Sequence, residues 1–165
     1  MRTPLSRISK KAAFLSTTAA AALTVAMTAT PALAWPAGSF TATLDGDMVI
    51  DAGIPATCTD STLTGSVAAD GTLTVTGASV SGCGVTVTPV GLPWSGSLSG
   101  GVASFDGFQM SAIGCTFGGD ITGSYSGGET FPVTAAFTEQ TVQRTSGWLC
   151  PSSATITASY TFAQS

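Results

Sequence analysis

Apolar and polar residues alternate along most of the chain after residue 35. Phe40, Ala42 and Leu44, for example, are separated by single Thr residues. A period of two is typical of strands that bury one face. Gly residues interrupt the runs every several positions, and no stretch after residue 35 has the longer period of a helix. The predicted strands cover residues 39–44, 61–67, 72–76, 85–90, 94–98, 102–105, 108–113, 120–125, 131–137 and 154–162.

These runs predict an all-β domain of about nine or ten strands, a number that fits two packed sheets or a closed barrel better than one open sheet. We therefore expect an antiparallel β-sandwich, with a barrel-like fold as the alternative. The strongest turn signal is Asp70-Gly71, which predicts a two-residue type I′ hairpin turn.

The chain has four Cys residues, an even number that favours two disulfides if the protein enters an oxidising compartment. Of the three possible connectivities, we expect Cys58–Cys83 with Cys115–Cys150, because each of these bonds closes a local loop. The first pair lies symmetrically about Asp70-Gly71, with each Cys 12 residues from the turn.

The same strict register conflicts with the apolar pattern of the hairpin. It would place the apolar residues of 61–67 on the opposite face from those of 72–76, which a single buried face does not allow. A β-bulge near the turn, or pairing across two sheets, would remove the conflict.

The N-terminal segment has the pattern of a secretory signal. Four basic side chains are followed by an apolar run at 19–27 and by Pro-Ala-Leu-Ala at 31–34. This order predicts a signal peptide over residues 1–34 that is cleaved in the mature protein. Residues 35–165 would then form a single β-sandwich domain, with Trp35 as a mobile terminal residue.

No later run reaches the roughly 20 apolar residues of a membrane-spanning helix. We expect a secreted protein, extracellular or associated with the cell wall, and not an integral membrane protein.

Charge narrows the range of partners. After residue 34 the chain keeps one base, Arg144, against nine acids, a formal charge of −8. Nucleic acid is excluded as a partner because its phosphates require clustered Lys or Arg. The expected partners are a glycan, a component of the cell envelope or another protein.

The usual catalytic side chains are missing. The sequence has no His, and no Lys follows residue 34, which removes Ser-His and Cys-His pairs and Schiff-base chemistry. We therefore expect that the protein is not an enzyme and carries no cofactor. Nine carboxylates remain, and most of the Asp residues adjoin Gly, where Asp commonly forms turns. A glycoside hydrolase needs only two carboxylates, so this activity stays as an alternative.

Metal binding has weak support. Zinc is not expected, because no His and no closely spaced Cys pair is present. Asp45, Asp47 and Asp51 are a weak calcium candidate, since their spacing lacks the regular alternation and closing Glu of a calcium loop. A polar turn is the alternative interpretation.

Trp94 and Trp148 are the candidates for stacking on a ligand, because an exposed Trp on a β-domain can bind a flat or apolar molecule. Each residue has a structural alternative. Trp94 could fill the core, and Trp148, two residues before Cys150, could pack on a disulfide.

Several motifs resemble a group of small exported actinobacterial β-proteins with paired Cys and no assigned activity. They are Cys-Thr and then Leu-Thr-Gly-Ser from Cys58, Ser81-Gly82-Cys83, Gly91-Leu92-Pro93-Trp94, and Ser-Ser-Ala-Thr-Ile-Thr-Ala-Ser-Tyr-Thr after Cys150. The resemblance implies an exported β-domain and carries over no catalytic residue.

Three functions follow in order of preference. The first is a secreted, non-catalytic binding or cell-surface interaction protein. The second is a carrier of a small apolar molecule, held in a cleft lined by residues such as Phe105, Phe108 and Met110. The third is the carboxylate-only hydrolase.

Overall fold

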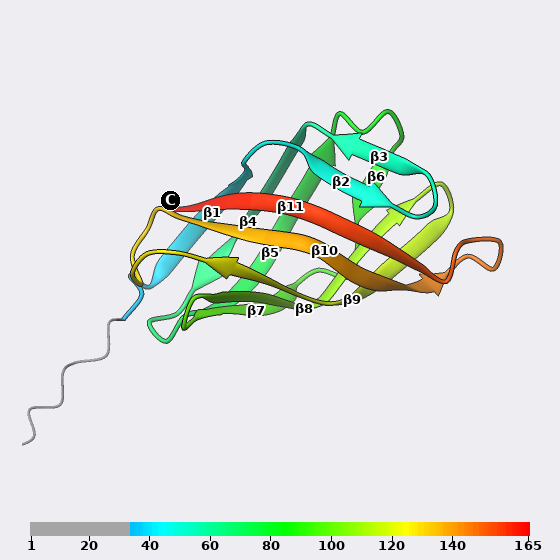
Figure 1. The fold of residues 1–165 in the computed structure, drawn as a ribbon. Helices are drawn as coiled ribbons and strands as arrows, with labels where there is room; N and C mark the ends of the chain where they lie inside the picture. The colour runs from blue at the N-terminus through cyan, green and yellow to red at the C-terminus, as the bar shows by residue number, and fades with distance from the viewer. Residues whose placement is uncertain (1–33) are drawn as a thin grey trace, which may run out of the picture. The chain divides into compact units, whose positions relative to one another are not determined.

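The computed structural model describes residues 34–165, and the alternation along the chain is that of its β-strands. These residues contain eleven strands and no helix. In chain order the strands are β1 (Gly38–Leu44), β2 (Met48–Asp51), β3 (Pro55–Cys58), β4 (Asp60–Val67), β5 (Thr72–Ser81), β6 (Val87–Pro89), β7 (Trp94–Ser99), β8 (Val102–Ala112), β9 (Cys115–Tyr125), β10 (Val133–Ser146) and β11 (Ser153–Gln164) (Figure 1).

The sheet closes on itself. Antiparallel neighbours follow the order β1, β4, β5, β7, β8, β9, β10, β11, and β11 pairs back with β1, which gives an eight-stranded closed barrel. The hairpin of β2 and β3 continues the sheet beyond β11, and β6 pairs with β8. The all-β prediction is confirmed, and the barrel-like alternative describes the observed closure. Each barrel strand pairs with a neighbour on both sides, although β5 pairs with β7 only over Thr72–Val75.

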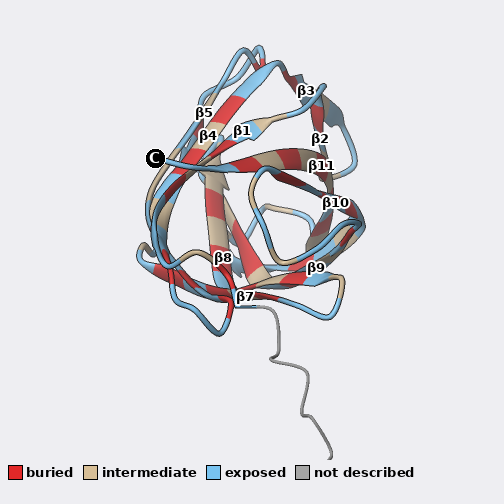
Figure 2. Cartoon of the chain, turned by 90° about the vertical axis from the view of Figure 1, so that its left-hand side faces the viewer, coloured by how far each residue is buried: buried red, intermediate tan, exposed pale blue. Residues whose placement is uncertain are grey.

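Buried residues alternate with exposed or partly exposed residues along the strands (Figure 2). The centre is filled by aromatic rings. Phe105 stacks on Phe137 with ring centroids 5.5 Å apart, and on Phe162 at 6.3 Å. Such layers of inward-facing side chains make a small barrel a packed core.

The β4–β5 hairpin contains a bulge, which is one of the two arrangements expected to remove the register conflict. One register extends along the half of the hairpin nearest the Cys58–Cys83 disulfide, and it shifts between Thr64 and Gly65. Because a shift of one residue reverses the side chains, the apolar residues of both strands face the interior. The predicted pairings Cys58–Cys83 and Cys115–Cys150 are both confirmed.

The turn of this hairpin differs from the predicted type I′ form, which needs positive φ at both central residues. Gly71 has a φ of +86°, whereas the φ of Asp70 is not positive. Asp70 Oδ1 instead accepts a hydrogen bond from Thr72 N at 2.9 Å, and this bond lowers the pKa of the Asp70 carboxyl. The loop therefore has Gly71 as its only left-handed residue.

Two short strands, β2 and β3, were not predicted, because each has only four residues and their hairpin turn contains Gly53. The predicted strands at 102–105 and 108–113 form the single strand β8, with an irregularity between Phe105 and Phe108. The predicted signal peptide lies outside the described residues except for Ala34. Residues 34–165 contain no helix of the length and hydropathy needed to cross a bilayer.

Candidate functional site

The loops of the barrel gather at two ends that differ in character (Figure 1). The closed end carries the β4–β5 turn, the β7–β8 turn and the β9–β10 loop. The open end carries the β2–β3 turn, the β8–β9 turn and the β10–β11 loop.

Trp35 fills the closed end. Only 2% of its surface is exposed, and its Nε1 donates a hydrogen bond to Leu98 O at 2.8 Å. Its ring packs on Phe131 and Tyr125, with centroid distances of 5.0 and 5.8 Å. A side chain at Gly71 would clash, since a Cβ there would lie 2.9 Å from the Trp35 ring. The expectation that Trp35 is mobile was therefore wrong, because long-range contacts hold it in the core.

The open end contains an apolar pocket of about 260 Å³. One wall comes from the β2–β3 hairpin, with Ile50, Ala52 and Ala56. The opposite wall comes from β6 and β8, with Val87 and Met110. No residue with a charged or hydrogen-bonding side chain lines this pocket, and its surface is mostly apolar, so it suits apolar groups.

Four large apolar side chains are exposed on the loops at this end: Ile54 (84%), Ile113 (78%), Trp148 (86%) and Leu149 (79%). We call them the apolar rim. Ile54 and Ile113 also line the pocket. Exposed large apolar groups next to an apolar cavity are the arrangement expected of a binding site, because their exposure to water is unfavourable unless a ligand or partner covers them.

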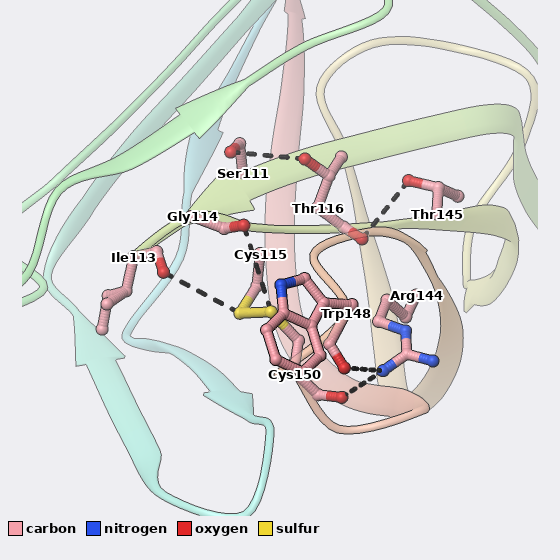
Figure 3. The surroundings of a disulfide bond; sticks show 9 residues. All are labelled: Ser111, Ile113, Gly114, Cys115, Thr116, Arg144, Thr145, Trp148 and Cys150. Carbon is pink, nitrogen blue, oxygen red and sulfur yellow. Dashed lines mark hydrogen bonds between the residues drawn. A yellow bond between two sulfur atoms is a disulfide. The ribbon is translucent and has the colours of Figure 1, made fainter.

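The β10–β11 loop carries Trp148 and Leu149 and is held by several bonds (Figure 3). The disulfide joins Cys150 to Cys115, which lines the pocket. The Arg144 guanidinium donates hydrogen bonds to Trp148 O, at 3.4 Å, and to Cys150 O. Arg144, the only basic residue after residue 34, therefore holds the loop that carries the rim residues Trp148 and Leu149.

The two Trp candidates lie in opposite environments. Trp94 is 2% exposed and packs on Phe108, with ring centroids 4.8 Å apart, so it offers no surface to a ligand from solvent. Trp94 therefore lies in the core, which is the structural alternative to ligand stacking that was given for it from the sequence. Trp148 lies next to the Cys115–Cys150 disulfide but is 86% exposed, which contradicts packing in the core. Of the two, only Trp148 has a surface free for stacking.

The carboxylates lie both in turns and in strands, and Asp120, for example, lies within β9. Asp51 Oδ1 accepts from Gly53 N at 2.8 Å, and Asp120 Oδ1 accepts from Gly107 N at 2.9 Å. In the calcium candidate, Asp47 and Asp51 stand at the two ends of β2, about 13 Å apart at the usual rise per residue. Residues 34–165 contain no group of three or more His, Cys, Asp or Glu side chains that could hold a metal ion. Of these acids, Asp51 makes a contact within a turn, whereas Asp120 makes a contact between two strands.

Residues 8–164 match the protein family described as "Alkane oxidation protein activator PraA/PraB-like". The chain belongs to the PraA/PraB-like family. No curated protein and no solved structure matches the chain. The description of the PraA/PraB-like family is that of an activator rather than of an enzyme, which agrees with a non-catalytic or binding role. It does not bear on the resemblance to actinobacterial proteins.

The open end of this PraA/PraB-like protein was only partly predictable. Met110 lines the pocket as expected for a carrier, whereas Phe105 and Phe108 lie deeper in the barrel, around a smaller cavity. Of the four rim residues, Trp148 was a stacking candidate from the sequence, whereas Ile54, Ile113 and Leu149 were missed. A usable signal was present, because Ile54, Ile113 and Trp148 each adjoin Gly in a turn, where a large apolar side chain is seldom buried.

Proposed function

We propose that the protein is an exported, non-catalytic binding protein that holds an unbranched hydrocarbon chain in the open-end pocket. The observation that carries the proposal is the pocket of about 260 Å³, which is lined by apolar side chains and bordered by an apolar rim. The family description, which speaks of alkane oxidation, supports a ligand of this kind.

Burial of the chain supplies the binding energy. Each methylene removed from water contributes about 0.8 kcal/mol, so a segment of about eight methylenes would gain roughly 6 kcal/mol before the cost of association. The pocket lining contributes no polar selectivity. Discrimination between chains would therefore rest on length and width.

Several features support export and the absence of catalysis. The two disulfides suit an oxidising compartment, and the N-terminal residues match a secretory signal. The mature chain would carry no His and no Lys. The rim would bring the pocket against an apolar source of ligand, with Trp148 as the largest contact. The glycan and cell-surface hypotheses lack a comparable site among residues 34–165.

The proposal can be tested by displacement of a fluorescent apolar dye by n-decane. Ala56 lines the pocket on β3 and is half-buried, so Ala56→Trp would occupy the pocket with an indole. Ala163 is exposed near the end of β11, and Ala163→Trp is the matched control. We expect decane to displace the dye from the wild type and from the control, but to bind Ala56→Trp at least tenfold more weakly. Equal decane affinities in all three proteins would refute the pocket as the binding site.

A further inference from the structure

The open-end pocket continues toward the barrel centre. A second cavity of about 20 Å³ lies in the interior, and Ile156 lines both cavities. On each of three strands, a residue that lines the pocket lies two positions from a residue that lines the inner cavity. Two positions correspond to about 7 Å along a strand. These pairs of pocket and inner-cavity residues are Ile50 and Met48, Met110 and Phe108, and Ile156 and Ala158. The inner cavity is therefore the next layer along the barrel axis.

Tyr160 gives this inner layer an unused hydrogen-bond acceptor. Ser61 Oγ donates to Ser79 O at 2.8 Å and lies 2.7 Å from Tyr160 Oη. Because a Ser hydroxyl has one proton, Tyr160 must be the donor of the second bond. Its Oη then has no proton left to donate and keeps a lone pair. Trp94, the other polar side chain of the lining, donates its Nε1 proton to Val90 O at 2.9 Å.

Tyr160 carries the phenolic proton that this assignment requires. Burial raises the pKa of Tyr160 to about 12, so the phenol stays neutral across the physiological range. A neutral phenol with its proton committed to Ser61 accepts hydrogen bonds without carrying charge. The inner layer therefore favours a neutral donor and disfavours a carboxylate.

We propose that the preferred ligand is an unbranched chain with a terminal hydroxyl, which donates its proton to Tyr160 Oη while the chain occupies the pocket. This inference rests on the proposed function. The inner cavity has about the volume of one water-sized group. An isolated water there would need two or more polar partners, whereas a hydroxyl carried in by a buried chain needs one acceptor. Rotation of Ile156 would join the two cavities.

The test compares three uncharged chains of similar length: 1-decanol, which can donate, nonyl methyl ether, which can only accept, and n-decane, which can do neither. Affinities are measured by dye displacement for the wild type and Tyr160→Phe. Loss of one neutral hydrogen bond should weaken decanol binding by about two- to tenfold. Ether and decane should bind both proteins equally, and unchanged decane binding also shows that the variant has kept its pocket.

Ser61→Ala supplies an independent test that does not require Tyr160→Phe to fold. Without Ser61 Oγ, the Tyr160 proton is free to be donated. We expect the ether to bind this variant more tightly than it binds the wild type. The inference is overturned if Tyr160→Phe leaves the decanol affinity unchanged, or if Ser61→Ala leaves the ether affinity unchanged. Failure of the wild type to bind any of the chains would instead refute the proposed function.

Discussion

The two ends of the barrel are secured in different ways. At the closed end, Trp35 packs on Tyr125 and Phe131, and side-chain volume fills the space. At the open end, two disulfides tie the loops together: one joins β3 to the end of β5, and the other joins β9 to the β10–β11 loop. A covalent bond holds backbone segments at a fixed separation without filling the volume between them. This difference is compatible with the apolar pocket at the open end.

The contrast predicts that Trp35, which fills the closed end, and Trp148, which is exposed at the open end, contribute very differently to stability. Trp35→Ala would leave a cavity at the closed end, at a cost of about 3 to 5 kcal/mol in the free energy of unfolding. Trp148→Ala removes a residue that is 86% exposed and should change that free energy by less than about 0.5 kcal/mol. Urea denaturation of both variants checks the pair. Similar losses in the two proteins would contradict the assignment of Trp35 as the plug of the closed end.

Removal of the second disulfide should loosen the open end. The double variant Cys115→Ser/Cys150→Ser opens a loop spanning 35 residues, with an expected loss of about 2 to 4 kcal/mol. Dye displacement by n-decane should also weaken, because the loop that carries Trp148 is no longer tied to β9. Unfolding measurements on the wild type with and without reductant provide a second comparison. A variant with full stability and full decane affinity would show that the disulfide does not shape the site.

The interior between the two ends should respond to alkaline pH through Tyr160. Its pKa is raised from 10.0 to about 12 in the folded protein. Because the pKa of Tyr160 is higher in the folded protein, its contribution to the free energy of unfolding is complete below pH 10. This contribution is lost as the pH rises toward 12. The free energy of unfolding should fall by about 2 kcal/mol over this interval, a decrease that Tyr160→Phe should lack. Parallel pH profiles for the two proteins would contradict burial of the Tyr160 hydroxyl as the cause of its raised pKa.

The period-two pattern was sufficient to predict an all-β fold, because inward and outward residues alternate on every strand of a barrel. Cys58–Cys83 and the bulge in the same hairpin were also predictable, since both depend on counting residues about one turn. The burial of Trp35 was not, because its partner Leu98 lies 63 residues away along the chain. The pocket was equally inaccessible, since its lining comes from strands and turns that become neighbours only when the sheet closes.

The central claim is that the open end binds a hydrocarbon chain, and methyl NMR tests it most directly. Titration of the wild type with 1-decanol should shift the methyl resonances of Ile50, Ile113 and Ile156, which line the pocket. The methyls of Leu73 and Leu98, in the barrel wall toward the closed end, should stay in place. Shifts spread evenly over both ends, or no shifts at saturating decanol, would contradict the account.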